Sequence, residues 1–223
     1  MVGTVLEYLQ LILDGLRFNL VIASSSFLLG LAAASALFAA CVASSSARRA
    51  VEAYARVVRG VPPLVLLAAF FWLVLPALGL PRDPILASIA AFTVRSAAFQ
   101  VQILRSVGLD EGQLEAALAL GMSGWQAATA VALPQSLRSA APALTNEFSS
   151  LLKESTQSLA LGVADALARA RYVSIATGYS LAWVLTAALL IYLVSLAAAK
   201  ASRAVYARLA IPGTVASGVV LWR

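Results

Sequence analysis

The chain has 223 residues, of which 61% are hydrophobic and 12% are charged, and its mean hydropathy is +0.90. Soluble domains carry about 25% charged residues and disordered chains combine low hydrophobicity with high net charge, so the composition excludes both classes. Because a membrane span takes about 20 apolar residues, the length holds roughly four to six spans. We expect an all-α membrane protein with a single transmembrane domain over residues 1–223.

The charged and reactive residues argue against an enzyme. The net charge is +6, but the basic residues lie between apolar runs, as membrane topology requires, and do not suggest a nucleic-acid surface. The sequence has no His, which removes the usual general base and the commonest metal ligand, and Cys41 has no partner for an intrachain disulfide. No Gly-x-x-x-x-Gly-Lys motif is present, so the chain cannot be its own ATPase.

Runs without charged residues predict the membrane spans in chain order. The run that begins at Pro84 is interrupted only by Arg95. The fourth segment is less apolar, and it can cross if its charged groups face protein or water and not lipid. The five predicted spans are 18–42, 60–80, 84–104, 137–163 and 176–199.

The connection between the third and fourth spans is predicted to be a loop with two short helices. Asp110 with Gln113, and Ser123 with Gln126, have the spacing of a capping box, in which each side chain bonds a backbone N–H of the other residue. Gly121 favours the end of the first helix. Each helix would be too short to cross a membrane.

The distribution of basic residues predicts the orientation. With five spans, ten Lys and Arg residues fall on the side of the 105–136 loop and at most five fall on the other side. Cytoplasmic loops carry the excess of basic residues. We therefore expect the 105–136 loop in the cytoplasm, the N-terminus outside and the C-terminus inside.

The loop contains the most specific motif of the sequence. Glu115-Ala116-Ala117 is followed four residues later by Gly121, and by a Leu-Pro pair a dozen residues further on. This pattern resembles the coupling loop, or EAA loop, of permease subunits of ABC importers. Small Ala side chains make a narrow helix that can enter a cleft, and Gly lets the chain turn sharply. The resemblance implies that Glu115, Ala116, Ala117 and Gly121 couple the chain to an ATPase subunit.

The flanking segments are similar to those of permeases for polar amino acids. Segment 59–62 resembles the Arg-Gly-Thr-Pro signature that opens their second span, and segment 98–105 resembles the end of their third. The similarity extends over about residues 12–205. The chain departs from the family at Val61, Phe99, Gln102 and Gln157, so the solute stays open.

The resemblance implies a multi-pass type I-like importer core in a prokaryotic inner or plasma membrane, paired with a second copy or a paralogous permease. The other implied partners are two copies of an ABC ATPase and an extracytoplasmic solute-binding protein. ATP would be used by the ATPase subunit, and no cofactor would bind this chain. The implied function is ATP-driven import of an amino acid or similar small polar solute by alternating access. The alternative is an ATP-independent channel or secondary carrier, in which the loop would have no partner.

Helical spacing predicts a polar stripe on the third span. A cation near the middle of a bilayer costs about 3 kcal/mol on insertion scales, so Arg95 needs a partner or a wet cavity. It could bind the carboxylate of a solute, or it could pair with Glu147 or Glu154 in the neighbouring span. The sequence leaves both open. The residues that share the stripe are Ser88, Phe92, Arg95, Phe99 and Gln102.

The fourth span has a second polar side. Asn146, Ser150 and Lys153 share it, because they are spaced i, i+4 and i+7. The resemblance places this region near the translocation path, and Lys153 matches a recurrent Lys of the family. We expect Glu154 to extend toward water at the outer interface, whereas Lys153 could do the same or face the path. The candidate path residues are Arg95, Phe99, Gln102, Asn146 and Lys153.

Overall fold

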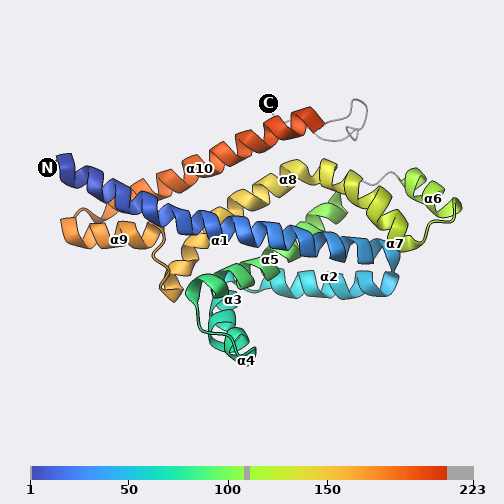
Figure 1. Cartoon of the computed structure of the whole chain (residues 1–223), viewed down its shortest axis with the longest axis horizontal. Helices are drawn as coiled ribbons and strands as arrows, with labels where there is room; N and C mark the ends of the chain where they lie inside the picture. The colour runs from blue at the N-terminus through green and yellow to red at the C-terminus, as the bar shows by residue number, and fades with distance from the viewer. Residues whose placement is uncertain (1, 108–110, 210–223) are drawn as a thin grey trace.

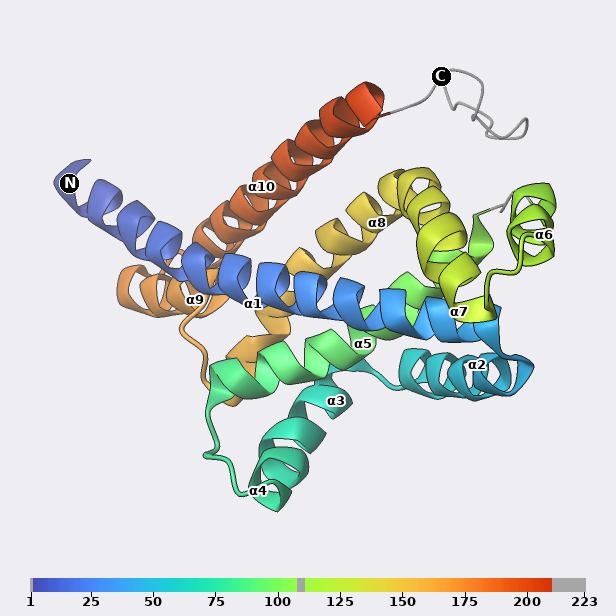
Figure 2. The same ribbon diagram turned by 45° about the vertical axis from the view of Figure 1, so that its right-hand side comes forward.

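The computed structural model describes the backbone of residues 2–107 and 111–209. Every regular element in these ranges is a helix. The short helix α6, Glu111–Ala119, lies at one end of the molecule, and α9, Ala166–Thr177, lies near the N-terminus at the opposite end (Figures 1 and 2). The all-α expectation is thus confirmed for this part of the chain.

The first helix is longer than the first predicted span. α1, Val2–Ala43, is one helix of 42 residues that extends along most of the molecule (Figure 1). Glu7 and Asp14 are exposed, whereas Ile12 and Leu16 are buried. The acidic residues interrupt the apolar run in the sequence but not the helix, because they lie away from the core.

The second helix, α2, Ser45–Gly60, begins almost immediately after α1. The Ser44 hydroxyl accepts a hydrogen bond from the N–H of Ala47 at 3.4 Å and caps it. Pro62 stops α2, and Val61 before it is extended, as the residue before a Pro usually is. The chain then turns by 101° into a second helical stretch. This stretch consists of α3, Pro63–Ala69, the π-helix η1, Phe70–Val74, and α4, Leu75–Ala77.

The helix α5, Pro84–Ser106, contains the whole of the predicted span 84–104. The Asp83 carboxylate accepts the N–H of Leu86 at 2.6 Å, and Pro84 fits the first turn, where no N–H is needed. α5 approaches α1 closely: a Cβ on Gly30 would lie 3.1 Å from the Cβ of Ser96.

Two capping boxes were predicted in the loop after α5, and only the second lies entirely within the described residues. The N–H of Gln126 donates to the Ser123 hydroxyl at 3.2 Å, and the N–H of Ser123 donates to Gln126 Oε1 at 2.8 Å, which confirms this box. Gly121 has φ +88° after the end of α6, as expected of a glycine that ends a helix. Asp110 of the other box lies outside the described residues.

The second short helix of the loop is not a separate element, so this part of the prediction is wrong. α7, Gly124–Ala127, continues through the π-helix η2, Ala128–Ala132, into α8, Leu133–Glu154. Pro134 does not end the helix, because the N–H of Leu133 bonds to the carbonyl of Ala128, five residues back. The wider turn makes room for the Pro ring.

The last third of the chain contains two short helices that the sequence did not predict as separate elements. The 3₁₀-helix η3, Ser155–Leu161, follows α8, and α9 and α10, Ser180–Leu209, complete the fold. Gly178, with φ +76°, separates α9 from α10. The predicted span 176–199 therefore includes the end of α9 as well as most of α10.

By length and composition, three helical segments of the described residues can cross a membrane: Val5–Ala43, Pro84–Ser106 and Leu181–Ala201. The bent pair of α2 with Pro63–Ala77 gives a fourth if it counts as one span. α8 is not among them, and it carries four charged residues, Arg138, Glu147, Lys153 and Glu154. The five spans and their orientation stay predictions.

Two apolar clusters form the core. One lies along the N-terminal half of α1 and includes Phe92 of α5 and Leu151 of α8. The other lies along the C-terminal half of α1 and includes Ala98 of α5 and Leu144 of α8. Phe27 of α1 packs against both. Along α5 and α8, Arg95, Ser96 and Glu147 lie between residues of the two clusters.

Candidate functional site

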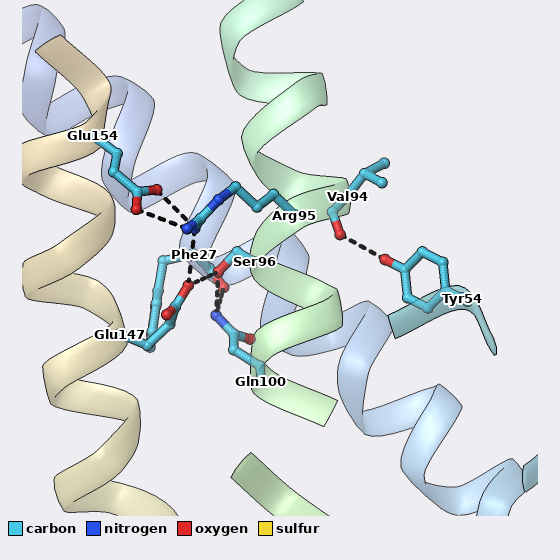
Figure 3. Close-up of polar contacts among 8 residues, drawn as sticks. All are labelled: Phe27, Tyr54, Val94, Arg95, Ser96, Gln100, Glu147 and Glu154. Atoms are coloured by element: carbon cyan, nitrogen blue, oxygen red, sulfur yellow. Dashed lines mark hydrogen bonds and ion pairs between the residues drawn. The ribbon is translucent and has the colours of Figure 1, made fainter. Parts of the chain in front are cut away.

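Five polar side chains on α5 and α8 lie close together beside the two apolar clusters. On α5 they are Arg95, Ser96 and Gln100, and on α8 they are Glu147 and Glu154 (Figure 3). We call these five residues the inter-core cluster. The Arg95 side chain is 11% exposed, and those of Glu147 and Glu154 are 6% and 22% exposed. Buried charges are costly unless they are paired, so the contacts within the cluster decide its energetics.

Arg95 pairs with both carboxylates, but unequally. Its two terminal nitrogens contact the two carboxylate oxygens of Glu154 at 2.7 Å each, which is the bidentate arrangement of a strong ion pair (Figure 3). The nearer oxygen of Glu147 lies 3.9 Å from Arg95 Nη1. Of the two arrangements that the sequence leaves open for Arg95, the structure contains the ion pair.

The position expected for Glu154 at the outer interface is not the one found. The long side chain turns inward and its carboxylate meets Arg95, because an unpaired buried guanidinium would cost more than bringing the carboxylate out of water. The neighbouring Lys153 is exposed, as is Asn146 on the same side of α8. Lys153 and Asn146 thus lie outside the buried cluster.

The neutral members of the cluster form a chain of hydrogen bonds. The Gln100 amide nitrogen donates to the Ser96 hydroxyl at 2.8 Å and to the carbonyl of Phe27 at 3.2 Å. Ser96 donates in turn to Glu147 at 3.4 Å. Gln100 is completely buried, and its Oε1 has no hydrogen-bond partner among the described residues. The cluster therefore ends in one acceptor that no described group satisfies.

Phe99 and Gln102, the other path candidates on α5, are half-buried. The guanidinium carbons of Arg95 and Arg59 lie 4.3 Å and 4.9 Å from the centre of the Phe99 ring, within cation–π range. The Tyr54 hydroxyl donates to the carbonyl of Val94 at 2.6 Å and holds α2 against α5 (Figure 3).

A second ion-paired contact joins α2 and α5 close to the loop. Arg105 donates to Glu52, which also lies 3.4 Å from Arg48. The hydrogen bond from Arg105 lowers the pKa of the Glu52 carboxyl below its usual range. Arg105 is one residue from the end of α5, so this contact holds α2 to the helix end from which the loop leaves.

The residues predicted to couple to an ATPase lie on the exposed helix α6 and the turn after it. Glu115, Ala116 and Gly121 are exposed, whereas Ala117 faces inward and is 6% exposed. Leu120 is 86% exposed, a large apolar side chain with no covering group in the described chain. Gln135 Nε2 of α8 donates to Gln113 Oε1 of α6 at 2.7 Å. The helix thus presents small and apolar side chains outward while it stays tied to α8.

A polar contact that the sequence analysis missed joins α1 to the start of α9. Asn19 Nδ2 donates to Ser155 Oγ at 2.9 Å and to Asp165 Oδ2 at 3.2 Å, and Asn19 Oδ1 accepts the N–H of Ala166 at 3.1 Å. Asn19, Ser155 and Asp165 are completely buried. We call these three residues the Asn19 joint. A single Asn inside an apolar run was the only signal for it.

These features define a class of protein: a helical membrane protein with a buried charged cluster between its helices and a short exposed helix at one end. The family model described as "binding-protein-dependent transport system inner membrane component" matches residues 20–210. The chain therefore belongs to this family, as the resemblance of its loop implies.

Curated relatives include transport proteins for different amino acids. The glutamate/aspartate import permease protein GltK of Escherichia coli O157:H7 is 30% identical over 208 residues, which cover 88% of this chain and 92% of the relative. The probable amino-acid permease protein YxeN of Bacillus subtilis is 34% identical over 57% of this chain and 63% of its own. The chain spans about half to two thirds of the length of four of these relatives. They are YxeN, two other probable amino-acid ABC transporter permeases, and the arginine transport system permease protein ArtQ of B. subtilis.

Solved structures share the fold. The crystal structure of an amino acid ABC transporter with histidines matches with a TM-score of 0.76 and 27% identity, over 92% of this chain and 97% of the other. An inward-facing conformation of the MetNI methionine ABC transporter matches with a TM-score of 0.73 at 22% identity, over 91% and 97% of the two chains. The second likeness concerns the fold alone. The expected importer-permease fold is thereby confirmed.

Proposed function

We propose that this chain is the permease subunit of an ATP-driven importer and forms the translocation path for an amino acid or a similar small polar solute by alternating access. Its partners are an ABC ATPase in two copies, an extracytoplasmic solute-binding protein and a second permease, identical or paralogous. ATP hydrolysis belongs to the ATPase subunits. Family membership and the likeness to amino-acid transporters support this assignment over an ATP-independent channel or carrier.

One observation carries the proposal: α6 lies at one end of the molecule (Figure 2), and two large apolar side chains, Leu118 on α6 and Leu120 just after it, are 47% and 86% exposed. An apolar side chain as exposed as Leu120 gains free energy when a partner covers it. The ATPase supplies that partner, with Glu115, Ala116, Ala117 and Gly121 at the contact. α6 is then cytoplasmic, in agreement with the orientation expected from the basic residues.

The connection from α6 into α8 explains how the contact transmits motion. After the turn at Gly121, α7, η2 and α8 form one continuous helical run, and Gln135 bonds back to α6. A displacement of α6 by the ATPase therefore moves α8 as a lever. α8 carries Glu147 and Glu154, so the motion reaches the inter-core cluster. The proposed path runs along Arg95, Phe99, Gln102, Asn146 and Lys153.

Accessibility of a single Cys tests the docking surface. Leu120→Cys in a Cys41→Ala background should react with a membrane-impermeant maleimide from the cytoplasmic side only, and co-assembled ATPase should protect it. Ile175→Cys on α9 is the control: the residue is 85% exposed, and the variant should react from the outside with or without ATPase. Equal labelling of Leu120→Cys with and without the ATPase would refute docking at α6.

Gly121→Asp tests coupling. A Cβ at Gly121 would meet no atom within 4 Å, so the variant should insert and assemble in the membrane. It places a negative charge and strained backbone in the docking turn, and ATP-driven uptake should fall at least about tenfold, a loss of about 1.4 kcal/mol. Gly79→Asp is the matched control, because Gly79 also has positive φ and open space around it. Uptake that falls equally in both variants would contradict the coupling role.

A further inference from the structure

The two ends of the loop between α5 and α8 lie against the same part of the chain. The loop leaves the end of α5 and returns as α7. Residues 43–52 run from the last residue of α1 into the first half of α2 and contact both ends of the loop, and we call them the elbow. Figures 1 and 2 both show the C-terminal end of α1, the start of α2 and α7 side by side, at the end of the molecule that carries α6.

The elbow holds the start of the loop through an ion pair. Arg105 Nη2 donates to Glu52 Oε1, and the Arg105 side chain is only 16% exposed. Glu52 is the single acidic residue of α2 and the only carboxylate that contacts Arg105 among the described residues. Arg48 also lies 3.4 Å from Glu52, but its side chain is 62% exposed, so this second pair contributes little. The more buried contact with Arg105 is therefore the one that fixes α5 to α2.

The elbow holds the end of the loop through a backbone contact. A Cβ on Gly124 would lie 3.2 Å from the Cα of Ala43 and 3.4 Å from its carbonyl oxygen. Gly124 is not among the described glycines with positive φ, so its backbone conformation does not require glycine. The missing side chain instead allows the close approach of α7 to the end of α1. A larger residue would push the two segments apart.

The elbow is stiff between these two contacts. Ser44 is the single non-helical residue between α1 and α2. Its N–H donates to the carbonyl of Ala40 at 3.0 Å, and its carbonyl accepts the N–H of Arg48 at 3.0 Å. Because both backbone groups of Ser44 are bonded, bending of the junction would cost hydrogen bonds. Ala43 and Glu52 therefore keep a fixed separation.

We propose that the elbow keeps the two ends of the loop at a constant separation, so that a displacement of α6 moves the ends of α1 and α2 together with α8, and that Glu52 is a positioning residue that acts through Arg105. This inference rests on the proposed function and gives the coupling motion a second route. Without the elbow, a force on α6 would spread the ends of the loop, and only part of the displacement would reach the spans. The shift of α5 against α8 at the inter-core cluster is then a rotation about this end of the molecule.

The first test measures ATP hydrolysis and uptake of a ¹³C-labelled mixture of the twenty amino acids by the complete complex, reconstituted in proteoliposomes with its ATPase and solute-binding protein. Glu52→Gln keeps the shape of the side chain and removes its charge, and the amount of amino acid taken up per ATP should fall by a factor of at least about three. Arg48→Gln is the matched control. It removes the exposed partner of Glu52 and leaves the contact with Arg105, so its uptake per ATP should equal that of the wild type.

Exchange of the two charges tests whether the ion pair itself is required. Glu52→Arg combined with Arg105→Glu should restore most of the uptake per ATP, because the same pair forms in reverse. A variant that only folds less well loses hydrolysis and uptake by the same factor and keeps their ratio. A wild-type ratio in Glu52→Gln would therefore overturn the proposal, and so would a double variant no better than Glu52→Gln.

A cross-link tests the contact at the other end of the loop. A Cβ on Gly124 would lie 3.6 Å from the Cβ of Ala43, within the range of a disulfide. Ala43→Cys with Gly124→Cys in a Cys41→Ala background should therefore oxidise to a disulfide, and the oxidised complex should take up amino acids about as fast as the same complex after reduction. Uptake that is lost on oxidation and recovered on reduction would show that the two segments separate during transport, and would overturn the proposal. Failure to form the disulfide would contradict the close approach.

The proposed function and the role of the elbow fail separately in these experiments. If the wild-type complex imports none of the twenty amino acids with ATP, the proposed function itself fails. If it imports them and Glu52→Gln has the wild-type uptake per ATP, only this inference fails.

Discussion

The Asn19 joint and the inter-core cluster are both buried, and both join helices that are far apart in sequence, but they differ in how completely their polar groups are paired. In the Asn19 joint, the Asn19 amide donates twice and accepts once, and Asp165 also caps α9 by accepting the N–H of Ala168 at 2.8 Å. In the inter-core cluster, one Arg serves two carboxylates, and one amide oxygen has no hydrogen-bond partner among the residues that the structure describes.

The difference indicates which contact is a fixed joint and which can exchange partners. A buried network in which every group is bonded loses hydrogen bonds in any rearrangement, so it holds one geometry. A network with an acceptor that no described residue satisfies and a cation shared by two carboxylates can exchange partners without leaving the cation unpaired. We therefore expect α1 and α9 to move together during transport, and α5 and α8 to shift relative to each other.

Removal of Arg95 should have the largest effect on stability. Arg95→Ala leaves Glu147 and Glu154 buried without their cation, which costs about 3–5 kcal/mol for a broken buried pair, and folded protein should be lost. Size-exclusion profiles and the thermal unfolding midpoint in detergent measure this. Changing both carboxylates to Gln in the same variant should recover most of the loss, because no unpaired charge remains. A triple variant as unstable as Arg95→Ala would contradict the charge-pairing account.

Gly15→Ala should have the next largest effect, because it disturbs the close approach of α1 to the Asn19 joint. A Cβ at Gly15 would lie 2.6 Å from the backbone carbon and oxygen of Asp165, so the two segments must separate. Overpacking of this kind costs about 1–3 kcal/mol, and contact with backbone predicts the upper end. Gly60→Ala is the control, because a Cβ there meets nothing within 4 Å. Equal thermal midpoints for the two variants would show that the close approach is unimportant.

Asn19→Ala should have the smallest effect of the three, about 2 kcal/mol. It removes three hydrogen bonds, but Asp165 keeps its bond to the N–H of Ala168 and Ser155 keeps its bond to the carbonyl of Leu152. The loss should appear in the thermal midpoint, and hydrogen exchange should rise first in α9. The same substitution at the exposed Asn146 should leave both measurements unchanged. Faster exchange in α5 and not in α9 would contradict the role of the joint.

Features that depend on neighbours in the sequence could be predicted. The capping box of Ser123 and Gln126 and the turn at Gly121 are fixed by spacings of a few residues, and the structure contains both. The extent of α1 could not be predicted from charge-free runs. Its acidic residues are compatible with a long helix only because the sides that carry Ile12 and Leu16 face other helices.

The partners of Arg95 show where the sequence stops being informative. Its place in an apolar span predicted a partner or a wet cavity. Glu154 follows Arg95 by 59 residues, and Glu147 follows Ser96 by 51. The choice between them depends on how α5 and α8 cross. Asn19 was harder still, because its partners lie on η3 and the start of α9, and neither element was predicted.

The π-helix η2 has a consequence for the rotational phase of α8. A π-turn holds one residue more than an α-turn, so residues after Ala132 are rotated by roughly 100° relative to an uninterrupted α-helix, the angle that one residue subtends. Side chains that share one side of the helix with Trp125, at 3.6 residues per turn, therefore do not stay on that side after η2. Deletion of one residue from Ala128–Ala132 would restore regular winding and turn Glu147 away from α5. The side of α8 that meets α5 is thus set by one additional residue placed just before Pro134.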